Sequence, residues 1–200
     1  MIHNLFPTPV GIYGINIPKN INEEYFKSLD ISGQHGLVSA GVSSHDTVKG
    51  ELYLLDQEVL LSIKQQLSLA VNEYAKNTGL QDLSITSSWF NIMAPNGKVL
   101  EHQHKVSTIS GALYVSAEAE TCPLVLKNPL NDFKILDIPA LDTPFTAKEA
   151  VIDTMTGRLI LFPSYLMHHT RENNSSDNRI VISFNTLPTQ VILNNQQQEI

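Results

Sequence analysis

The sequence predicts a mainly β (α+β) fold: an antiparallel jelly roll or barrel with helices packed outside it. After Gly79, short runs rich in β-branched and aromatic residues alternate with turn-forming residues, and no helical stripe reappears. About nine such runs follow one another at a spacing typical of antiparallel sandwiches and barrels. With 200 residues, 42% of them apolar, the chain is long enough to bury a sizeable core.

The N-terminal part holds the predicted helices. Prolines between apolar pairs favour a short edge strand over residues 10–17. Residues 20–29 predict a short helix with Asn22 as its N-cap. Residues 32–50 are rich in glycine and serine and keep no helical or strand period, so we expect a long loop there.

One long helix is predicted over residues 56–77. Its apolar side chains recur with a period near 3.6 residues, and Gly79 supplies a usual stop signal. We interpret this helix as scaffold, because a core-facing apolar stripe needs no cofactor to explain it.

The remaining chain predicts strands separated by turns. We expect one domain over residues 1–200, with an N-terminal helical and loop part (1–80), a β core (81–187) and a polar tail (188–200) that is frayed over residues 194–200. The predicted strands cover residues 85–93, 99–104, 108–116, 124–127, 133–138, 150–153, 158–162, 168–171 and 179–185.

Charge and composition exclude several classes of partner. The formal net charge is −7, from 20 acidic and 13 basic residues, which disfavours nucleic acid and anionic lipid surfaces. The apolar runs are too short to span a bilayer, so we expect no membrane partner. A single cysteine, Cys122, and a start without a secretory signal pattern indicate a reduced, cytoplasmic location. Exposed sheet edges leave a homodimer open.

The pair His102 and His104 has the spacing of metal ligands. Residues two apart on a strand point to the same face, so both imidazoles should project into one cavity while Glu101 faces away. A second pair, His168 and His169, follows a hydrophobic strand and a Phe-Pro-Ser turn. Adjacent strand residues face opposite sides, so only one of these two should join the first pair.

Arg179 opens an otherwise apolar strand eleven residues after His168. A guanidinium at such a position needs an anion, because a buried unpaired charge costs several kcal/mol, and a small-molecule carboxylate would serve. Two histidines on an early strand, a third much later and an arginine one strand beyond suggest a non-haem iron site with room for a dicarboxylate.

These residues resemble a known family, the iron(II)- and 2-oxoglutarate-dependent dioxygenases, in particular small bacterial and phage members that are similar to prolyl hydroxylases. The resemblance extends over residues 5–186 and implies a double-stranded β-helix (jelly roll) with flanking N-terminal helices. The matching segments are Leu5-Phe-Pro-Thr-Pro9, Trp89-Phe-Asn91, His102-Gln-His104, Ser110-Gly-Ala-Leu-Tyr114, Asn128-Pro129, the segment from Gly157 to His168, and Arg179-Ile-Val-Ile-Ser-Phe-Asn185.

The resemblance implies a ligand set for iron. His102 would be the first ligand, His104 would occupy the place of the usual carboxylate, and His168 would be the distal ligand. A three-histidine site carries one negative charge less than a site with two histidines and a carboxylate, so its iron affinity and reactivity could differ.

The resemblance also implies a cosubstrate site. Arg179 would pair with the far carboxylate of 2-oxoglutarate, and Tyr114, which strand parity from His104 places on the cavity side, would hydrogen-bond the same group. Asn91 is a weaker candidate, either for contact with the cosubstrate or for a supporting role behind the residues that bind it. Val181 stands where many relatives have a serine.

The activity that the resemblance implies uses iron(II), 2-oxoglutarate and dioxygen. The enzyme would hydroxylate an unidentified small-molecule or peptidyl substrate and decarboxylate 2-oxoglutarate to succinate. One alternative is a cupin-like three-histidine metalloprotein that does not use 2-oxoglutarate, in which Arg179 would be a structural ion-pair partner. Another is a jelly-roll binding module whose histidines take adventitious metal.

Other notable residues have simpler interpretations. His35 and His45 are expected to be exposed loop residues, with a lid over the site as the functional alternative. Core or rim packing is expected for Trp89, Phe90 and Tyr165. No histidine is placed in the sequence to activate Cys122, so that residue is expected to be a spectator.

Overall fold

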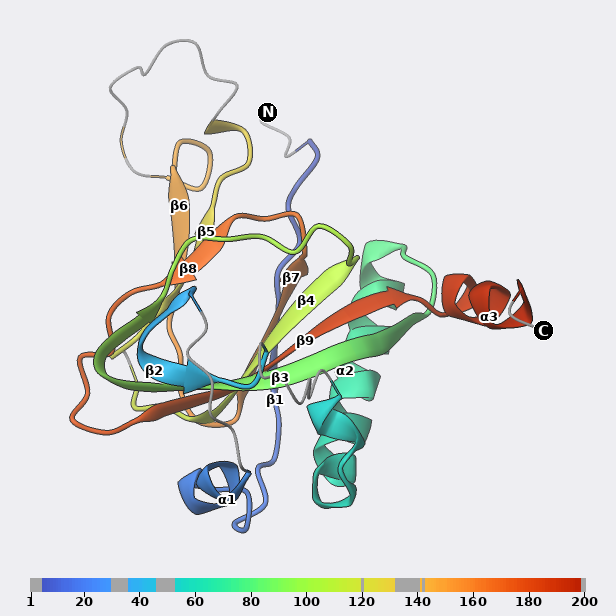
Figure 1. Ribbon diagram of the computed structural model, residues 1–200. Helices are drawn as coiled ribbons and strands as arrows, with labels where there is room; N and C mark the ends of the chain where they lie inside the picture. The colour runs from blue at the N-terminus through green and yellow to red at the C-terminus, as the bar shows by residue number, and fades with distance from the viewer. Residues whose placement is uncertain are drawn as a thin grey trace.

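A computed structural model describes residues 5–29, 36–45, 53–119, 121–131, 141 and 143–198. Within these ranges it contains nine strands in two antiparallel sheets, so the predicted mainly β fold is confirmed (Figure 1). The strands are β1 (Gly11–Gly14), β2 (Val38–Ser43), β3 (Leu83–Val99), β4 (Ile109–Ser116), β5 (Leu124–Lys127), β6 (Glu149–Ile152), β7 (Arg158–Pro163), β8 (His168–Thr170) and β9 (Arg179–Pro188).

The two sheets differ in size. The larger has six strands in the order β1-β7-β4-β9-β3-β2, and the smaller has three in the order β6-β5-β8. Figure 1 shows α2 lying along the larger sheet, with the smaller sheet away from that helix. None of the helices in the described residues has the length and apolar character needed to cross a membrane. The helices are α1 (Glu23–Ser28), α2 (Leu61–Thr78) and α3 (Thr189–Gln198).

Strand alternation divides the larger sheet into two faces. Along β9, the side chains of Ile180, Ile182 and Phe184 join the main hydrophobic core. Those of Val181 and Arg179 point the other way, where Val181 packs with residues of β5 and Arg179 lines a cavity. A period of two residues therefore builds a core on one face and a site on the other.

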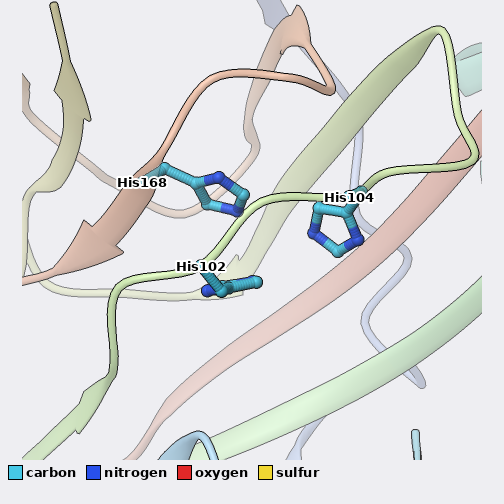
Figure 2. Close-up of side chains that lie close together, drawn as sticks. All are labelled: His102, His104 and His168. Atoms are coloured by element: carbon cyan, nitrogen blue, oxygen red, sulfur yellow. The ribbon is translucent and has the colours of Figure 1, made fainter. Parts of the chain in front are cut away.

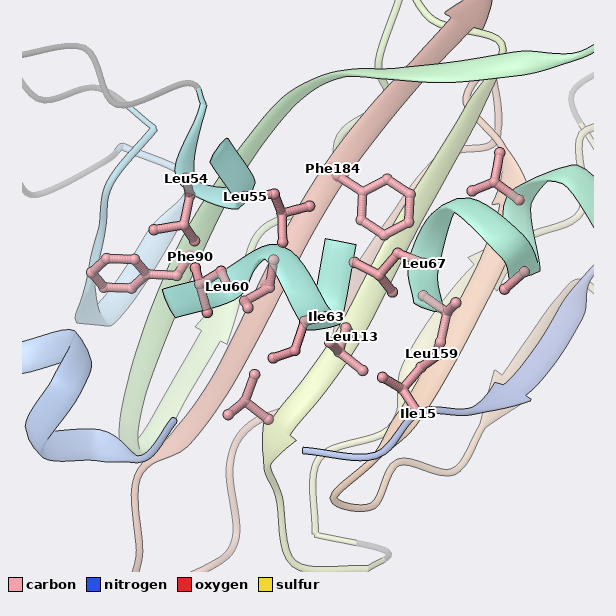
Figure 3. Packing of buried hydrophobic residues seen from close by; sticks show 14 of the residues in the cluster. Ile15, Leu54, Leu55, Leu60, Ile63, Leu67, Phe90, Leu113, Leu159 and Phe184 are labelled. Atoms are coloured by element: carbon pink, nitrogen blue, oxygen red, sulfur yellow. The ribbon is translucent and has the colours of Figure 1, made fainter. Parts of the chain in front are cut away.

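The main core lies between α2 and the larger sheet (Figure 3). Ile63 and Leu67 of α2 are fully buried there together with Leu113 of β4 and Leu159 of β7. Burying one such side chain contributes about 1.5–3 kcal/mol. This packing holds the strands that carry the functional face.

The predicted long helix is confirmed, with a different start. It ends at Thr78 and is capped by Gly79, whose φ of 73° is the left-handed conformation of a glycine cap. Two short 3₁₀ turns, Leu54–Asp56 and Glu58–Leu60, precede it. The apolar periodicity continues through these turns because Leu54, Leu55 and Leu60 are buried in the same core.

Of the other N-terminal predictions, the edge strand and the short helix are confirmed and the long loop is partly wrong. The edge strand appears as β1, and the short helix appears as α1, where the Asn22 side chain accepts a hydrogen bond from the backbone N–H of Tyr25. The prediction of a loop over residues 32–50 is wrong for residues 38–43, which form β2. Pairing with β3 creates this strand, despite its lack of alternation. Residues 32–35 and 46–50 lie outside the described residues.

The predicted division of β3 into two strands is wrong. The segment Pro95-Asn-Gly97 lies inside one continuous strand that ends at Val99. The register with β2 shifts at this segment, and Asn96 has a φ of 63°. Backbone hydrogen bonds with Asn173 hold it on its other side. Turn-forming residues here produce a bulge, because β2 pairs with the strand on one side and Asn173 bonds its backbone on the other.

Most later strands agree with the prediction within a few residues. The predicted strand over residues 133–138 lies outside the described residues. Residues 194–200 were expected to be frayed, but residues 194–198 belong to α3, whose first residue is held by a backbone hydrogen bond from Thr189 to the carbonyl of Asp82.

Candidate metal centre

Two chain segments bring three histidines together. The segment after β3 runs beside β8, where His102 and His168 exchange backbone hydrogen bonds of 3.0 and 2.9 Å. The backbone N–H of His104 donates to the carbonyl of Ser164 at 3.0 Å. The prediction that His102 and His104 lie within a strand is therefore wrong. They lie just beyond one, in backbone held by hydrogen bonds.

The imidazoles of His102, His104 and His168 surround one small space (Figure 2). Their ring centroids are 4.2 Å (102 to 168), 5.1 Å (102 to 104) and 5.3 Å (104 to 168) apart. One nitrogen from each ring lies within 4.8 Å of the other two. This spacing fits three ligands of a single metal ion, and nitrogen donors suit iron.

Hydrogen bonds select the nitrogen that two of these rings offer. Nδ1 of His102 lies 2.8 Å from the carbonyl of Leu100, and Nδ1 of His168 lies 2.9 Å from the carbonyl of Leu166. A carbonyl accepts only, so each Nδ1 carries the proton and each Nε2 carries the lone pair. Metal-binding histidines usually have this arrangement.

Burial keeps two of the three rings, His104 and His168, uncharged. Desolvation, reinforced by the neighbouring His102, lowers the pKa of His168 to about 3. Desolvation, with His102 and His45 adding to it, lowers the pKa of His104 to about 4. Both rings are therefore neutral near pH 7, which is the form that binds metal.

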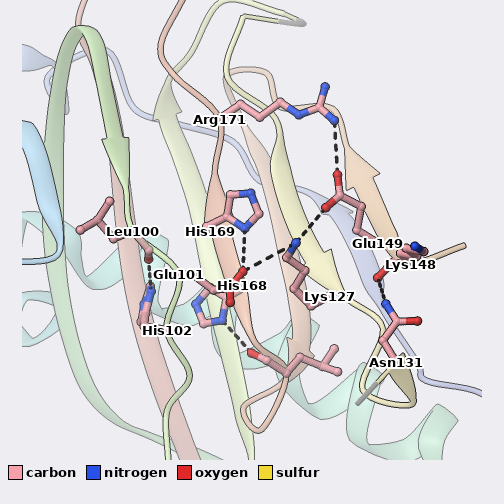
Figure 4. Close-up of polar contacts among 11 residues, drawn as sticks. Leu100, Glu101, His102, Lys127, Asn131, Lys148, Glu149, His168, His169 and Arg171 are labelled. Atoms are coloured by element: carbon pink, nitrogen blue, oxygen red, sulfur yellow. Dashed lines mark hydrogen bonds and ion pairs between the residues drawn. The ribbon is translucent and has the colours of Figure 1, made fainter. Parts of the chain in front are cut away.

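A chain of charged side chains supports the outer side of this segment (Figure 4). Glu101 lies 3.7 Å from Lys127 and 3.7 Å from Nδ1 of His169, and Lys127 reaches Glu149 at 3.1 Å. Glu101 thus faces away from the cluster, as strand parity predicts, and His168 rather than His169 joins the other two histidines.

A cavity of about 210 Å³ adjoins the histidines. The three predicted cosubstrate residues, Asn91, Tyr114 and Arg179, lie in its wall together with all three histidines. They come from β3, β4 and β9, neighbouring strands of the larger sheet, and all face away from α2. Apolar side chains from both sheets, including Leu124, complete the wall.

Arg179 is a buried cation without an anionic partner among the described residues. It is 2% exposed, and its Nη1 contacts Cys122 at the carbonyl oxygen (3.4 Å) and at Sγ (2.7 Å). Its Nε makes no hydrogen bond, and its guanidinium lies 5.7 Å from the ring centre of Tyr114. Such an arrangement fits a carboxylate ligand, which would satisfy both charge and hydrogen bonding.

Tyr114 and Asn91 are also largely buried. Burial raises the pKa of Tyr114 to about 12, so its hydroxyl stays protonated and can donate a hydrogen bond. The Asn91 side chain is 3.5 Å from the hydroxyl of Ser183 and 7% exposed.

Sequence reasoning missed three features of the site. His45 was expected to be exposed, but it lines the cavity with its ring 4.7 Å from that of Trp89, which in turn lies 5.6 Å from the ring of His104. Cys122 was expected to be a spectator, but it contacts Arg179, a contact for which the sequence holds no signal. The third is Asn185, 3.3 Å from His104 and on the strand face of Arg179, which parity could have shown.

The aromatic residues behave differently from one another. Phe90 packs in the main core, as expected. Trp89 is 6% exposed and lines the cavity. Tyr165 is 57% exposed and belongs to no described core cluster. His35 lies outside the described residues.

The fold and the converging histidines define a metal-dependent enzyme on a double-stranded β-helix. The family model described as "Putative 2OG-Fe(II) oxygenase" matches residues 87–185, the range that holds every candidate site residue named above except His45. The chain belongs to the 2OG-Fe(II) oxygenases, enzymes that use iron(II), 2-oxoglutarate and dioxygen. This assignment confirms the resemblance and disfavours the cupin-like alternative.

Solved structures share the fold. HygX from Streptomyces hygroscopicus, with nickel, 2-oxoglutarate and hygromycin B bound, is 12% identical, with 91% of this chain and 84% of that chain covered and a TM-score of 0.55. A prolyl hydroxylase from Trichoplax adhaerens, in complex with a peptide fragment of hypoxia inducible factor, is 14% identical, with 90% and 84% covered and a TM-score of 0.56.

The chain covers 56% of a 2OG-Fe(II) oxygenase family oxidoreductase from Burkholderia pseudomallei, with 64% of this chain covered, 12% identity and a TM-score of 0.47. No curated protein matches the chain.

Proposed function

We propose that this oxygenase is a hydroxylase of a small-molecule or peptidyl substrate and converts 2-oxoglutarate to succinate. His102, His104 and His168 hold the iron, and Arg179 binds the far carboxylate of 2-oxoglutarate. The observation that carries the proposal is a buried guanidinium without an anionic partner among the described residues, in the same cavity as three clustered imidazoles.

The residues around Arg179 are suited to a carboxylate. Its Nε lacks a partner, and the protonated hydroxyl of Tyr114 comes from the neighbouring strand. Binding a carboxylate here replaces a costly unpaired charge by a charge-assisted pair in a site of low dielectric. Arg179 and Tyr114 therefore orient the cosubstrate by its far end.

The histidine cluster is suited to iron(II). The carbonyls of Leu100 and Leu166 fix two rings so that Nε2 is the donor, and burial keeps His104 and His168 unprotonated. When bound, iron(II) supplies the oxidative chemistry, in which one oxygen atom of dioxygen enters succinate and the other becomes the hydroxyl group of the product, with release of carbon dioxide.

The cavity wall has a role of its own. Leu124, Phe162 and Val181 line it from both sheets and are nearly fully buried. Apolar walls limit water beside the reacting carbon and strengthen the interaction between Arg179 and a carboxylate.

Similar folds support both substrate classes. HygX was solved with hygromycin B, a small molecule, and the Trichoplax adhaerens enzyme with a peptide fragment. The site residues do not favour one class over the other, so the proposal covers both.

Succinate formation tests the proposal before a substrate is known. The purified protein with Fe(II), 2-oxoglutarate and air should release succinate slowly, and His168→Ala should abolish this release. His169→Ala is the matched control, because its ring points toward Glu101, and it should keep the wild-type rate. Equal succinate release by the wild type and His168→Ala would contradict the proposed iron site.

A further inference from the structure

A hydrogen-bond chain begins at His104 and leads away from the metal cluster. Nδ1 of His104 lies 3.3 Å from Nδ2 of the Asn185 side-chain amide. Oδ1 of the same amide lies 2.8 Å from Oγ of Ser110, which lies 2.8 Å from Oγ of Ser164. Ser110 is 3% exposed and Ser164 is fully buried, so the far end of the chain is shielded from solvent.

The chain can run in two directions. If the Asn185 amide donates through Nδ2, then Nδ1 of His104 is the acceptor and the ring proton sits on Nε2. If the amide is turned by 180° about its bond to Cβ, its Oδ1 accepts from Nδ1–H of His104, its Nδ2 donates to Ser110, and Ser110 donates to Ser164. Only the second direction leaves the lone pair of Nε2 free for a metal ion.

We propose that Asn185 is a positioning residue for the metal site, whose side-chain oxygen accepts the Nδ1 proton of His104 and so turns Nε2 toward the metal. This inference rests on the proposed function, because it assumes that His104 binds the metal. It gives the third histidine the support that the carbonyls of Leu100 and Leu166 give the other two.

The support comes from three separate parts of the fold. Asn185 lies on β9, Ser110 on the paired strand β4, and Ser164 directly after β7. The backbone carbonyl of Ser164 also accepts a hydrogen bond from the backbone N–H of His104. Ser164 therefore holds the backbone of His104 and also ends the hydrogen-bond chain that starts at its ring. Both ends of His104 are therefore held in place.

A histidine at position 104 makes this support necessary. A carboxylate offers an acceptor oxygen to a metal ion whichever way it is turned. A neutral imidazole offers one lone pair, and the partner of its other nitrogen decides which nitrogen carries it.

Metal affinity tests the assignment without catalysis. With Co(II) as probe, we expect Asn185→Ala to weaken binding by about 10–100-fold, as loss of such outer partners typically does. Asn185→Asp keeps an acceptor for Nδ1–H and should stay within about threefold of the wild type or bind more tightly. Asn178→Ala is the control. This asparagine lies near the other end of β9, where its side chain bonds Glu23, so its replacement should leave the Co(II) affinity unchanged.

The outcomes that overturn the proposal are distinct. Wild-type affinity in Asn185→Ala, or an equal loss in Asn185→Ala and Asn185→Asp, would exclude acceptance of the Nδ1 proton. The ¹⁵N spectrum of histidine-labelled wild type loaded with Zn(II) needs no variant: we expect His104 to show Nδ1–H and a metal-bound Nε2.

The same spectrum separates this inference from the proposed function. A signal from Nε2–H of His104 in the Zn(II)-loaded protein would overturn the role of Asn185 and leave a site formed by His102 and His168. A wild type that binds neither Co(II) nor Zn(II) would overturn both the inference and the proposed iron site.

Discussion

Replacing Arg179 by methionine should strongly weaken cosubstrate binding without destabilising the ligand-free protein. Methionine keeps much of the length and apolar volume of the side chain but removes a buried charge that has no anionic partner among the described residues. Replacing a poorly compensated buried charge by an apolar side chain is commonly neutral or stabilising. The unfolding temperature of the ligand-free variant should therefore equal or exceed that of the wild type.

The effect on 2-oxoglutarate binding should be large. Truncating one partner of a buried, hydrogen-bonded charge pair costs about 2–5 kcal/mol, or roughly 30- to 5,000-fold in Kd. At a ligand concentration of about 100 times the wild-type Kd, the wild type gains about 2.7 kcal/mol. A variant with Kd raised about 100-fold gains only about 0.4 kcal/mol at the same concentration.

Thermal unfolding of the Mn(II)-loaded protein with and without 2-oxoglutarate measures both effects. For a domain of this size, 1 kcal/mol shifts the unfolding temperature by about 2–4 °C, so the wild type should gain about 5–10 °C and Arg179→Met at most about 2 °C. Arg158→Met, a change at the half-buried first position of β7, which does not line the cavity, should keep the full shift. A ligand-free Arg179→Met that unfolds several degrees below the wild type would show a structural arginine and refute the reasoning.

Three further predictions concern the cluster and its support. In calorimetric titrations, His104→Ala should weaken Co(II) binding by about 100-fold or more, and the control His169→Ala should weaken it by less than about threefold. Equal Co(II) affinities of the two variants would show that His104 does not bind the metal. The folded-state pKa values of His168 and His104 lie below the unfolded value of about 6.5, so the metal-free protein should be most stable above pH 6.5 and lose stability as pH falls toward 4. Urea unfolding between pH 4.5 and 6.5 should show a shallower dependence for His168→Gln, and parallel curves would contradict the pKa assignment. Gly111→Ala would place Cβ 2.2 Å from the Phe184 ring and should cost about 1–3 kcal/mol of unfolding free energy, whereas an unchanged midpoint would contradict this packing.

Strand alternation is the part of the fold that sequence predicts best. The run from Arg179 to Asn185 has isoleucine or phenylalanine at every second position, and these side chains do pack against α2. Parity then places Arg179 and Asn185 on the same, opposite face. The signal is strong because a one-residue slip would move a whole apolar face into the cavity.

Segments whose structure depends on distant partners were not predictable in the same way. β2 has no alternation of its own and becomes a strand through pairing with β3. The Pro95-Asn-Gly97 segment has the composition of a turn, yet its neighbours on both sides keep it within β3 as a bulge. The local residues predict that the strand is irregular at this segment, but they do not decide between a bulge within one strand and a turn between two strands.

The site shows the same division. His102 and His104 were expected side by side because of strand parity, and they lie side by side although the strand ends at Val99. Their placement depends instead on backbone bonds to His168 and Ser164, more than fifty residues away. The contact of Cys122 with Arg179 likewise joins residues distant in sequence, for which no spacing pattern exists.

The most direct test of the central claim is the binding of 2-oxoglutarate to the Fe(II)-loaded protein under anaerobic conditions, followed by visible absorption. A weak metal-to-ligand band should appear in the wild type and be weakened or lost in Arg179→Met and His168→Ala. A wild type that binds iron but gives no band with 2-oxoglutarate would contradict the account and restore the three-histidine metalloprotein that does not use this cosubstrate.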